Sequence, residues 1–154
     1  MSETPSAQLA STRLFSGLSV HDLEAIYRNG TVVSLGAGKN LIREGQENDY
    51  LHVVLKGQLE VSLPDRGDRF STVRLGVLAP GDCIGEYSFF DHEPVSADVD
   101  TLTEVQLFKI SQADLDRVLT AYPRIGSVLF KNMLTQLIDR LRVKDAELDL
   151  FTPY

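Results

Sequence analysis

The sequence contains a single cysteine, Cys83, and has no excess of positive charge. One cysteine excludes an internal disulfide and any metal or iron–sulfur site that needs several thiolates. Fifteen lysines and arginines stand against 22 aspartates and glutamates, so the formal net charge is −7. Nucleic acid and anionic membrane surfaces attract basic proteins. We therefore expect no direct nucleic-acid binding and no membrane partner.

Long apolar runs are also missing from the sequence. No stretch approaches the roughly 18 apolar residues that a membrane-spanning helix needs. The first ten residues, MSETPSAQLA, lack the basic segment and apolar run of a secretory signal peptide. We expect a cytoplasmic protein. A chain of 154 residues suits one domain with a sizeable core, so we predict a single domain over residues 1–154.

Helical signals stand near the start of the chain. Residues 6–15 are expected to form a short helix. A second helix should begin after Ser19, because Ser19 and Asp22 have the spacing of a capping box, with aspartate in place of the usual glutamate. Gly30 marks its expected end.

The helical pattern returns at about residue 111 and continues to about residue 148. Ser111 and Asp114 repeat the capping pattern, and Pro123 stands where proline favours the first turn of a long helix. One face of that helix is predicted to be a homodimer interface; its residues are Phe130, Leu134, Leu137, Leu141 and Leu148. The alternative is that the helix packs only on its own domain.

Between these helices the apolar period changes from helical to twofold, which is typical of half-buried β-strands. Strands are expected at residues 51–55, 59–63, 73–77 and 105–107. Val73, Leu75 and Val77 should form the buried face of the third strand. Several short strands at regular spacing predict an all-β sandwich or barrel, here over about residues 30–110.

Four features over about residues 10–145 resemble the cyclic-nucleotide-binding domain of catabolite-activator-like regulators, kinase regulatory subunits and gated channels. LIREGQENDYLHVVLKGQLEV resembles the strand–turn–strand of that family, LAPGDCIGE its approach to the phosphate-binding cassette, and GEYSFFDHEPVSA the cassette itself. A long helix follows, as in the family. The resemblance implies a mainly β fold with flanking helices. The strands would form a double-stranded β-helix, a jelly-roll-like β-roll, with short N-terminal helices and a long C-terminal one.

The resemblance also implies how a ligand would be held. In the family, a Gly–Glu pair starts the short cassette helix, the glutamate binds a ribose hydroxyl, and an arginine about nine residues later binds the cyclic phosphate. Gly85 and Glu86 match the pair, but Val95 stands at the position of the arginine. The implied ligand-binding positions are Gly85, Glu86, Tyr87, Ser88, Val95, Ser96 and Ala97 in the cassette, with Arg74, Asn132 and Thr135 outside it.

The missing arginine sets the main question about function. Losing a buried, charge-assisted partner costs about 2–5 kcal/mol, which is about 30- to 5,000-fold in affinity. Asp98 lies nearby in the sequence and would add repulsion. Arg74 could replace the charge, but its alternation with Val73 and Leu75 favours a solvated position on the opposite face.

Other positions bear on the size of the ligand cavity and on its far wall. The bulky cassette residues Tyr87, Phe89 and Phe90 are expected to fill part of the cavity. Asn132 and Thr135 lie at about the depth at which family members touch the base from the long helix.

Two functions remain open. The first is a regulatory, ligand-sensing module for a cyclic nucleotide or cyclic dinucleotide, with a non-standard cassette. The second is a module on the same fold that binds no nucleotide and serves for dimerisation or docking of a protein partner. The match at Gly85, Glu86 and Ser96 favours the first, whereas Val95 and the bulky aromatic residues favour the second.

Enzymatic chemistry is not expected. The sequence has no nucleophile elbow, P-loop or cluster with metal-ligand spacing, so we predict no catalytic residues and no metal site. Activator-like regulators carry a DNA-binding helix-turn-helix after the long helix. The sequence stops at Tyr154. A whole protein of this length would need a partner to bind DNA, whereas this limit would not apply to a piece of a longer protein.

Overall fold

The computed structural model describes residues 5–65, 67 and 71–151. In chain order, the elements are α1 (Pro5–Leu9), η1 (Arg13–Phe15), α2 (Val20–Tyr27), β1 (Thr31–Leu35), β2 (Asn40–Ile42), β3 (Tyr50–Lys56), β4 (Leu59–Leu63), β5 (Val73–Leu78), β6 (Cys83–Ile84), α3 (Glu86–Asp91), β7 (Asp98–Thr101), β8 (Val105–Ser111), α4 (Gln112–Ala121) and α5 (Pro123–Phe151). The predicted single domain over residues 1–154 stays a prediction, because its ends lie outside the described residues.

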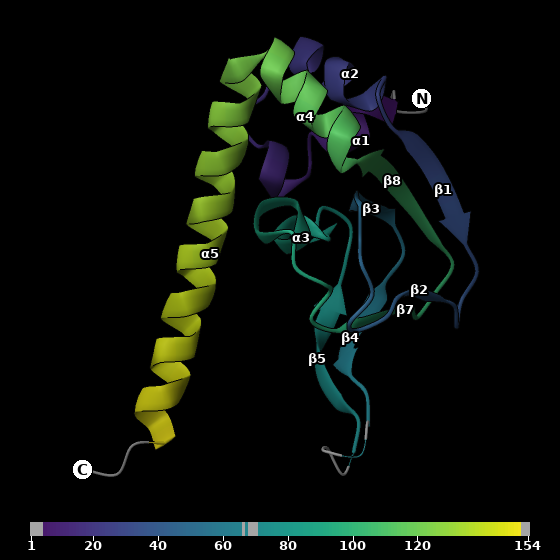
Figure 1. Ribbon diagram of the computed structural model, residues 1–154, viewed down its shortest axis with the longest axis vertical. Coiled ribbons are helices and arrows are strands. Elements are labelled where there is room, and N and C mark those ends of the chain that lie inside the picture. The colour runs from purple at the N-terminus through teal and green to yellow at the C-terminus, as the bar shows by residue number, and fades with distance from the viewer. Residues whose placement is uncertain (1–4, 66, 68–70, 152–154) are drawn as a thin grey trace.

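Within the described residues, the strands form two antiparallel four-stranded sheets, in the orders β1-β8-β3-β6 and β2-β7-β4-β5. The chain crosses between the sheets repeatedly, which makes a β-roll (Figure 1). One apolar cluster joins strands of both sheets and includes Ile42, Val54, Leu59, Val99 and Leu107. A second cluster packs α1, α2, α4 and the start of α5 against β3 and β8. The predicted fold class, a β-roll flanked by helices, is confirmed.

Strand β3 lies between these two clusters, so both of its faces are covered. Leu51 and Val53 belong to the helix-covered cluster, and Val54 belongs to the cluster inside the roll. His52, on the same face as Val54, is also buried. The sequence alternation identified the face with Leu51 and Val53, but the opposite face is also removed from solvent.

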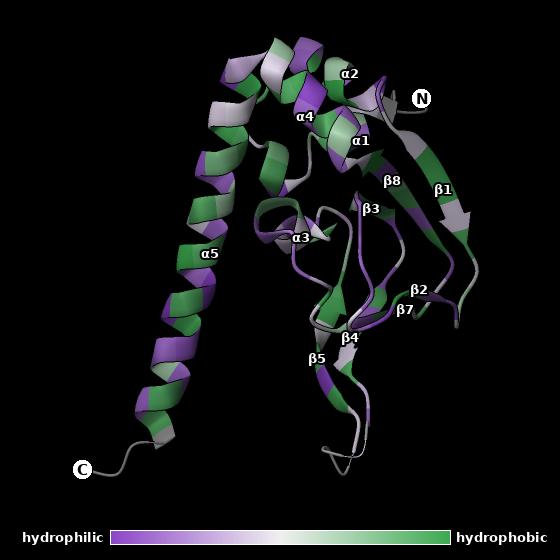
Figure 2. Cartoon of the chain, in the orientation of Figure 1, coloured by the Kyte–Doolittle hydropathy of each residue, from purple (hydrophilic) through white to green (hydrophobic). Residues whose placement is uncertain are grey.

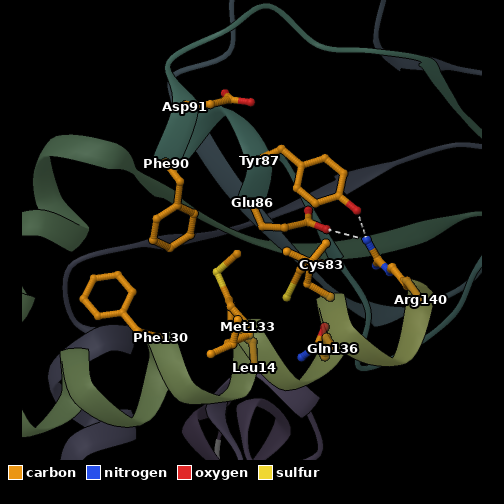
Figure 3. A pocket seen from close by; sticks show the side chains of 12 residues that line it. Leu14, Cys83, Glu86, Tyr87, Phe90, Asp91, Phe130, Met133, Gln136 and Arg140 are labelled. Carbon is orange, nitrogen blue, oxygen red and sulfur yellow. Dashed lines mark hydrogen bonds and ion pairs between the residues drawn. The ribbon is translucent and has the colours of Figure 1, made fainter. Parts of the chain in front are cut away.

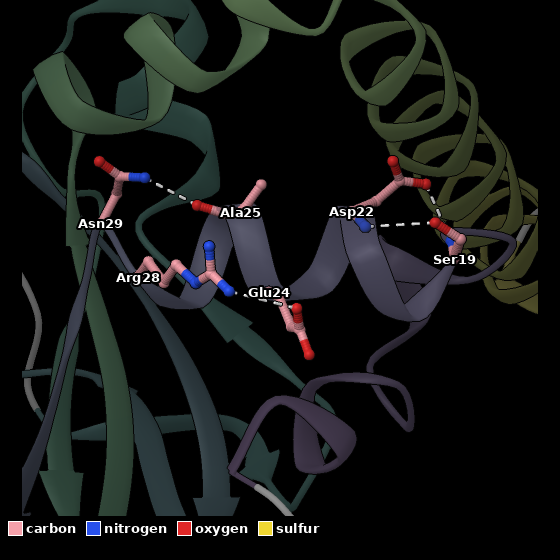
Figure 4. A network of polar contacts seen from close by, with 6 residues as sticks. All are labelled: Ser19, Asp22, Glu24, Ala25, Arg28 and Asn29. Carbon is pink, nitrogen blue, oxygen red and sulfur yellow. Dashed lines mark hydrogen bonds and ion pairs between the residues drawn. The ribbon is translucent and has the colours of Figure 1, made fainter.

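The start of α2 is fixed by the predicted capping box. The Ser19 hydroxyl accepts the Asp22 N–H at 3.2 Å, and the Asp22 carboxylate accepts the Ser19 N–H at 2.9 Å (Figure 4). Further along, Asn29 Nδ2 donates to the Ala25 carbonyl at 2.7 Å. The Asp22 carboxylate also pairs with Arg124 at the beginning of α5. This one aspartate therefore joins α2 to the long helix.

Two predictions about the N-terminal helices are wrong in detail. Residues 6–15 do not form one helix, because α1 ends at Leu9 and a short 3-10 turn follows at Arg13–Phe15. Helix α2 ends at Tyr27, before Gly30. Gly30 is needed for close packing: a Cβ there would lie 2.3 Å from Cζ of Phe108.

The predicted buried face of β5 is also wrong. Val73, Leu75 and Val77 are 45%, 55% and 45% exposed. Strand β5 is at the edge of its sheet, and its pairing with β4 shifts register between Val61 and Ser62. Leu75 and Val77 line a cavity together with residues of β4 and β7, so this face of β5 borders open space instead of a packed layer of side chains.

Helix α5 is the longest element, with 29 residues, and begins at Pro123 as predicted. Its first turns are buried through Ile125 and Leu129, whereas every residue from 137 to 150 is exposed. Apolar and polar residues alternate around this exposed half (Figure 2). A helix with the length and apolarity to cross a membrane does not occur in the described part of the chain.

Candidate functional site

A glycine before the cassette helix α3 and a side-chain hydrogen bond to the loop after it hold this helix in place. Gly85 precedes it with φ of 88°, and a Cβ there would lie 2.3 Å from Nδ2 of Asn48 and 2.5 Å from the carbonyl oxygen of Tyr50. Only glycine combines that left-handed backbone with that close approach. Ser88, the third residue of α3, is buried, and its hydroxyl donates to the carbonyl of Glu93, beyond the end of the helix, at 3.0 Å. The position of Glu86, the first residue of α3, is therefore fixed by the strand β3 beneath it.

A cavity of about 440 Å³ lies beside α3, and we call it the roll cavity. Its walls from β4, β5 and β7 are mostly apolar. All seven predicted cassette positions line it: Gly85, Glu86, Tyr87, Ser88, Val95, Ser96 and Ala97. One further lining residue, Arg140, comes from α5. The folded chain thus brings the cassette together with the long helix around one space.

Val95, which the sequence resemblance places at the position of the family's phosphate-binding arginine, has apolar neighbours. Its side chain packs against the apolar cluster inside the roll. Its backbone is tied to the loop after β2, since its N–H donates to the Gln46 carbonyl at 2.9 Å and its carbonyl accepts the Gly45 N–H at 2.8 Å. Two backbone hydrogen bonds therefore hold Val95 against this loop.

Arg140 reaches the start of the cassette helix from α5 (Figure 3). Its Nη1 donates to Oε1 of Glu86 at 3.4 Å and also to the hydroxyl of Tyr87. The Arg140 side chain is 52% exposed, whereas the Glu86 side chain is only 15% exposed. Among the described residues that line the roll cavity, Arg140 is the one arginine or lysine.

The electrostatic environment of Glu86 is unfavourable to its charge. Burial raises the pKa of the Glu86 carboxyl, and the charge of Asp82 adds to this effect. The Arg140 guanidinium acts in the opposite direction but does not cancel the effect of burial. An ionised Glu86 therefore benefits from any additional hydrogen-bond donor that enters the cavity.

The predicted positions outside the cassette do not line this cavity. Arg74 forms an ion pair with Glu60 on the neighbouring strand and its side chain is 62% exposed. Asn132 donates to the carbonyls of Leu14 and Ser16 at 2.9 and 2.8 Å, and Thr135 donates to the Lys131 carbonyl within α5. The residue of α5 that does line the cavity is Arg140, which the sequence analysis missed.

A second cavity, of about 310 Å³, lies between α3 and α5, and we call it the helix cleft (Figure 3). Its walls are mainly apolar, and the rings of Phe90 and Phe130 meet edge to face across it, 5.4 Å apart. Three of the predicted interface residues, Phe130, Leu134 and Leu137, line this cleft. Glu86, Tyr87 and Arg140 line both cavities, so they stand at the junction.

The expected crowding of the roll cavity is wrong for two of the three aromatic residues. Phe89 packs against the helix-covered core and Phe90 lines the helix cleft, so only Tyr87 lines the roll cavity. The carboxylate of Asp98 accepts the Glu44 N–H at 2.7 Å and is not part of the cavity wall.

Side chains of metal-ligating and nucleophilic types also occur at this site. Among the described residues, no group of three or more His, Cys, Asp or Glu side chains is placed to hold a metal ion. Cys83 lines both cavities, and burial raises its pKa, so the thiol is not activated as a nucleophile.

Comparison with protein families identifies the class of protein. The family model "Cyclic nucleotide-binding domain" matches residues 32–122, which is more than half of the chain. The chain belongs to this family of regulatory domains, and the resemblance inferred from the cassette is confirmed.

A curated relative matches almost the whole length of this chain. The chain is 29% identical over 145 residues to glutaminase 1 of Bradyrhizobium diazoefficiens, a match that covers 94% of this chain but only 22% of that protein. The chain therefore spans less than a quarter of the length of this relative.

Among solved structures, the N-terminal domain of a transcriptional regulator from Streptomyces coelicolor is 28% identical, with a TM-score of 0.77, and the match covers 89% of this chain and 94% of that one. The regulatory domain of Toxoplasma gondii PKA, solved as a co-crystal with cAMP, is 25% identical, with a TM-score of 0.65 over 73% of this chain and 42% of that one.

Proposed function

We propose that this domain senses a cyclic nucleotide in the roll cavity through a non-standard cassette and transmits occupancy to α5. The observation that carries the proposal is the shared lining: seven cassette positions and one residue of α5 surround a single cavity of about 440 Å³. That volume falls in the usual range for small-molecule sites, about 300–1,000 Å³.

The class of ligand follows from the family and from the residues that the cassette retains. The Toxoplasma gondii relative binds cAMP in its co-crystal. In this chain Glu86 is placed to accept a ribose hydroxyl, whose donated hydrogen bond would favour the ionised carboxylate. With Val95 in place of arginine, we expect weaker binding than in a complete cassette. A cyclic dinucleotide is the second candidate ligand.

A module that binds no nucleotide is the alternative function, and the exposed face of α5 favours it. Phe130, Leu134, Leu137, Leu141 and Leu148 are all exposed in one chain. Such a contiguous apolar face is typical of an interaction surface. We propose that it forms a homodimer interface, which is compatible with either function, or else binds a protein partner. A cytoplasmic location stays a prediction.

Isothermal titration with cAMP, cGMP and cyclic di-GMP tests the proposed function, with Val95→Arg as the comparison. We expect the natural protein to bind one of the cyclic mononucleotides, and Val95→Arg to bind it about 30-fold more tightly or better, since a charge-assisted contact is restored. Absence of binding by the natural protein, with binding by Val95→Arg, would refute sensing of these nucleotides and support the interaction module.

A further inference from the structure

The charges around the roll cavity pose a problem for an anionic ligand. Two carboxylates, Glu86 and Asp91, line it, and Val95 adds no charge. Asp82 lies close enough to raise the pKa of Glu86 further. A cyclic phosphate brings another negative charge into a largely apolar space, where an unpaired charge is costly. Arg140 is the only arginine or lysine among the described lining residues that can compensate it.

We propose that Arg140 supplies, from α5, the phosphate-binding charge that the cassette lacks at Val95. This inference rests on the proposed function and identifies the residue that would bind the phosphate of the ligand. Arg74, the other arginine considered for the role, is paired with Glu60 and lies outside the lining.

The present contacts of Arg140 leave it able to take this role. Both of its hydrogen bonds use Nη1, and its guanidinium also lies over the Tyr87 ring, 5.6 Å from the ring centre. A guanidinium carries five N–H donors in a fork that suits phosphate oxygens, so donors remain for a ligand. The contact with Glu86 is 3.4 Å long, which is beyond the usual range for a strong hydrogen bond. The side chain is half exposed, so it can change rotamer without disrupting the core.

Binding would exchange one set of partners for another. When Arg140 turns to the phosphate, the Glu86 carboxylate loses part of its compensation, and its burial then requires a new donor. A ribose hydroxyl provides that donor. A molecule that carries both groups satisfies Glu86 and Arg140 together, while a nucleoside satisfies only Glu86. The pair therefore selects a nucleotide over a nucleoside.

The exchange also links the ligand to the long helix. Arg140 lies in the half of α5 whose residues are exposed from 137 onward, and its described contacts with α3 are those with Glu86 and Tyr87. A phosphate bound by Arg140 would fix this half of the helix to the contents of the roll. Occupancy of the cavity then changes how α5 is held.

Titration of cAMP and adenosine into the natural protein, Arg140→Gln and Arg142→Gln tests this assignment. Arg142 is also an exposed arginine of α5 but does not line either cavity, so it is the matched control. We expect Arg140→Gln to weaken cAMP binding about 10- to 100-fold, the usual value of a hydrogen bond to a charged group. Adenosine binding should change little, and Arg142→Gln should behave as the natural protein. Adding Val95→Arg to Arg140→Gln should restore cAMP binding.

The outcomes separate the two proposals. If the natural protein binds cAMP and Arg140→Gln binds it equally well, Arg140 is not the phosphate partner, although the sensing function stands. An equal loss of cAMP and adenosine binding would also overturn the assignment, because Arg140 would then maintain the shape of the cavity. If the natural protein binds no nucleotide, the proposed function fails and this inference fails with it.

Discussion

His52 is a buried histidine on β3, only 5% exposed, and its Nδ1 has no hydrogen-bond partner among the described residues. Burial, together with the charge of Lys109, lowers its pKa from 6.5 to about 4. The folded protein therefore holds His52 neutral at pH 7, whereas the unfolded chain takes up a proton near pH 6.5. It follows that stability is lost as the pH falls from about 6.5 toward 4.

Replacement of His52 by glutamine should remove that part of the pH dependence. Between pH 7 and pH 4.5, the natural protein should lose up to roughly 3 kcal/mol more unfolding free energy than His52→Gln. Urea unfolding at the two pH values measures the difference. His21→Gln, at an exposed position on α2, is the control. Equal slopes for the natural protein and His52→Gln would contradict the assignment.

At the scale of secondary structure, the cap of α2 is the clearest case in which local sequence determines an element. Ser19→Ala removes the hydroxyl that accepts the Asp22 N–H. We expect it to lower the unfolding free energy by about 1 kcal/mol, the typical value of an N-cap. Ser127→Ala, at an exposed position inside α5, should stay within about 0.5 kcal/mol of the natural protein. A loss no larger than that of the control would show that the packing around Asp22, rather than the cap, fixes this helix.

The contrast between α2 and β5 shows what could be predicted from sequence. A capping box uses atoms three residues apart, so the start of α2 could be read locally. The apolar alternation of Val73, Leu75 and Val77 correctly predicted a strand. It could not say whether another layer would cover that face, because this depends on the position of β5 at the sheet edge.

The candidate site likewise contains residues that a local motif predicts and a residue that only the folded structure brings into place. The cassette motif is contiguous, so its seven positions could be named before the structure was known, and they do line one cavity. Arg140 lies 54 residues away from Glu86 and follows no motif. Its place at the cavity depends on how α5 passes α3, which no local pattern in the sequence encodes. The prediction of Asn132 and Thr135 used only their depth along the helix, and neither residue lines the cavity.

At the scale of the whole molecule, α5 is expected to hold two chains together. Leu137→Glu places a charge at the centre of the proposed interface and should convert a dimer to a monomer, which sedimentation equilibrium would measure. Val143→Glu is the matched control, because Val143 is equally apolar and exposed but lies on another face of the helix. A natural protein that is already monomeric at high micromolar concentration would contradict the dimer proposal.

We propose that a ligand bound in the roll cavity stabilises both the cassette helix α3 and the long helix α5. Amide hydrogen exchange, measured with and without saturating cAMP, tests it most directly. We predict slower exchange both in α3, at residues 86–91, and in α5 around residues 136–144, because Arg140 connects the two. Protection confined to the roll, with exchange in α5 unchanged, would contradict the account.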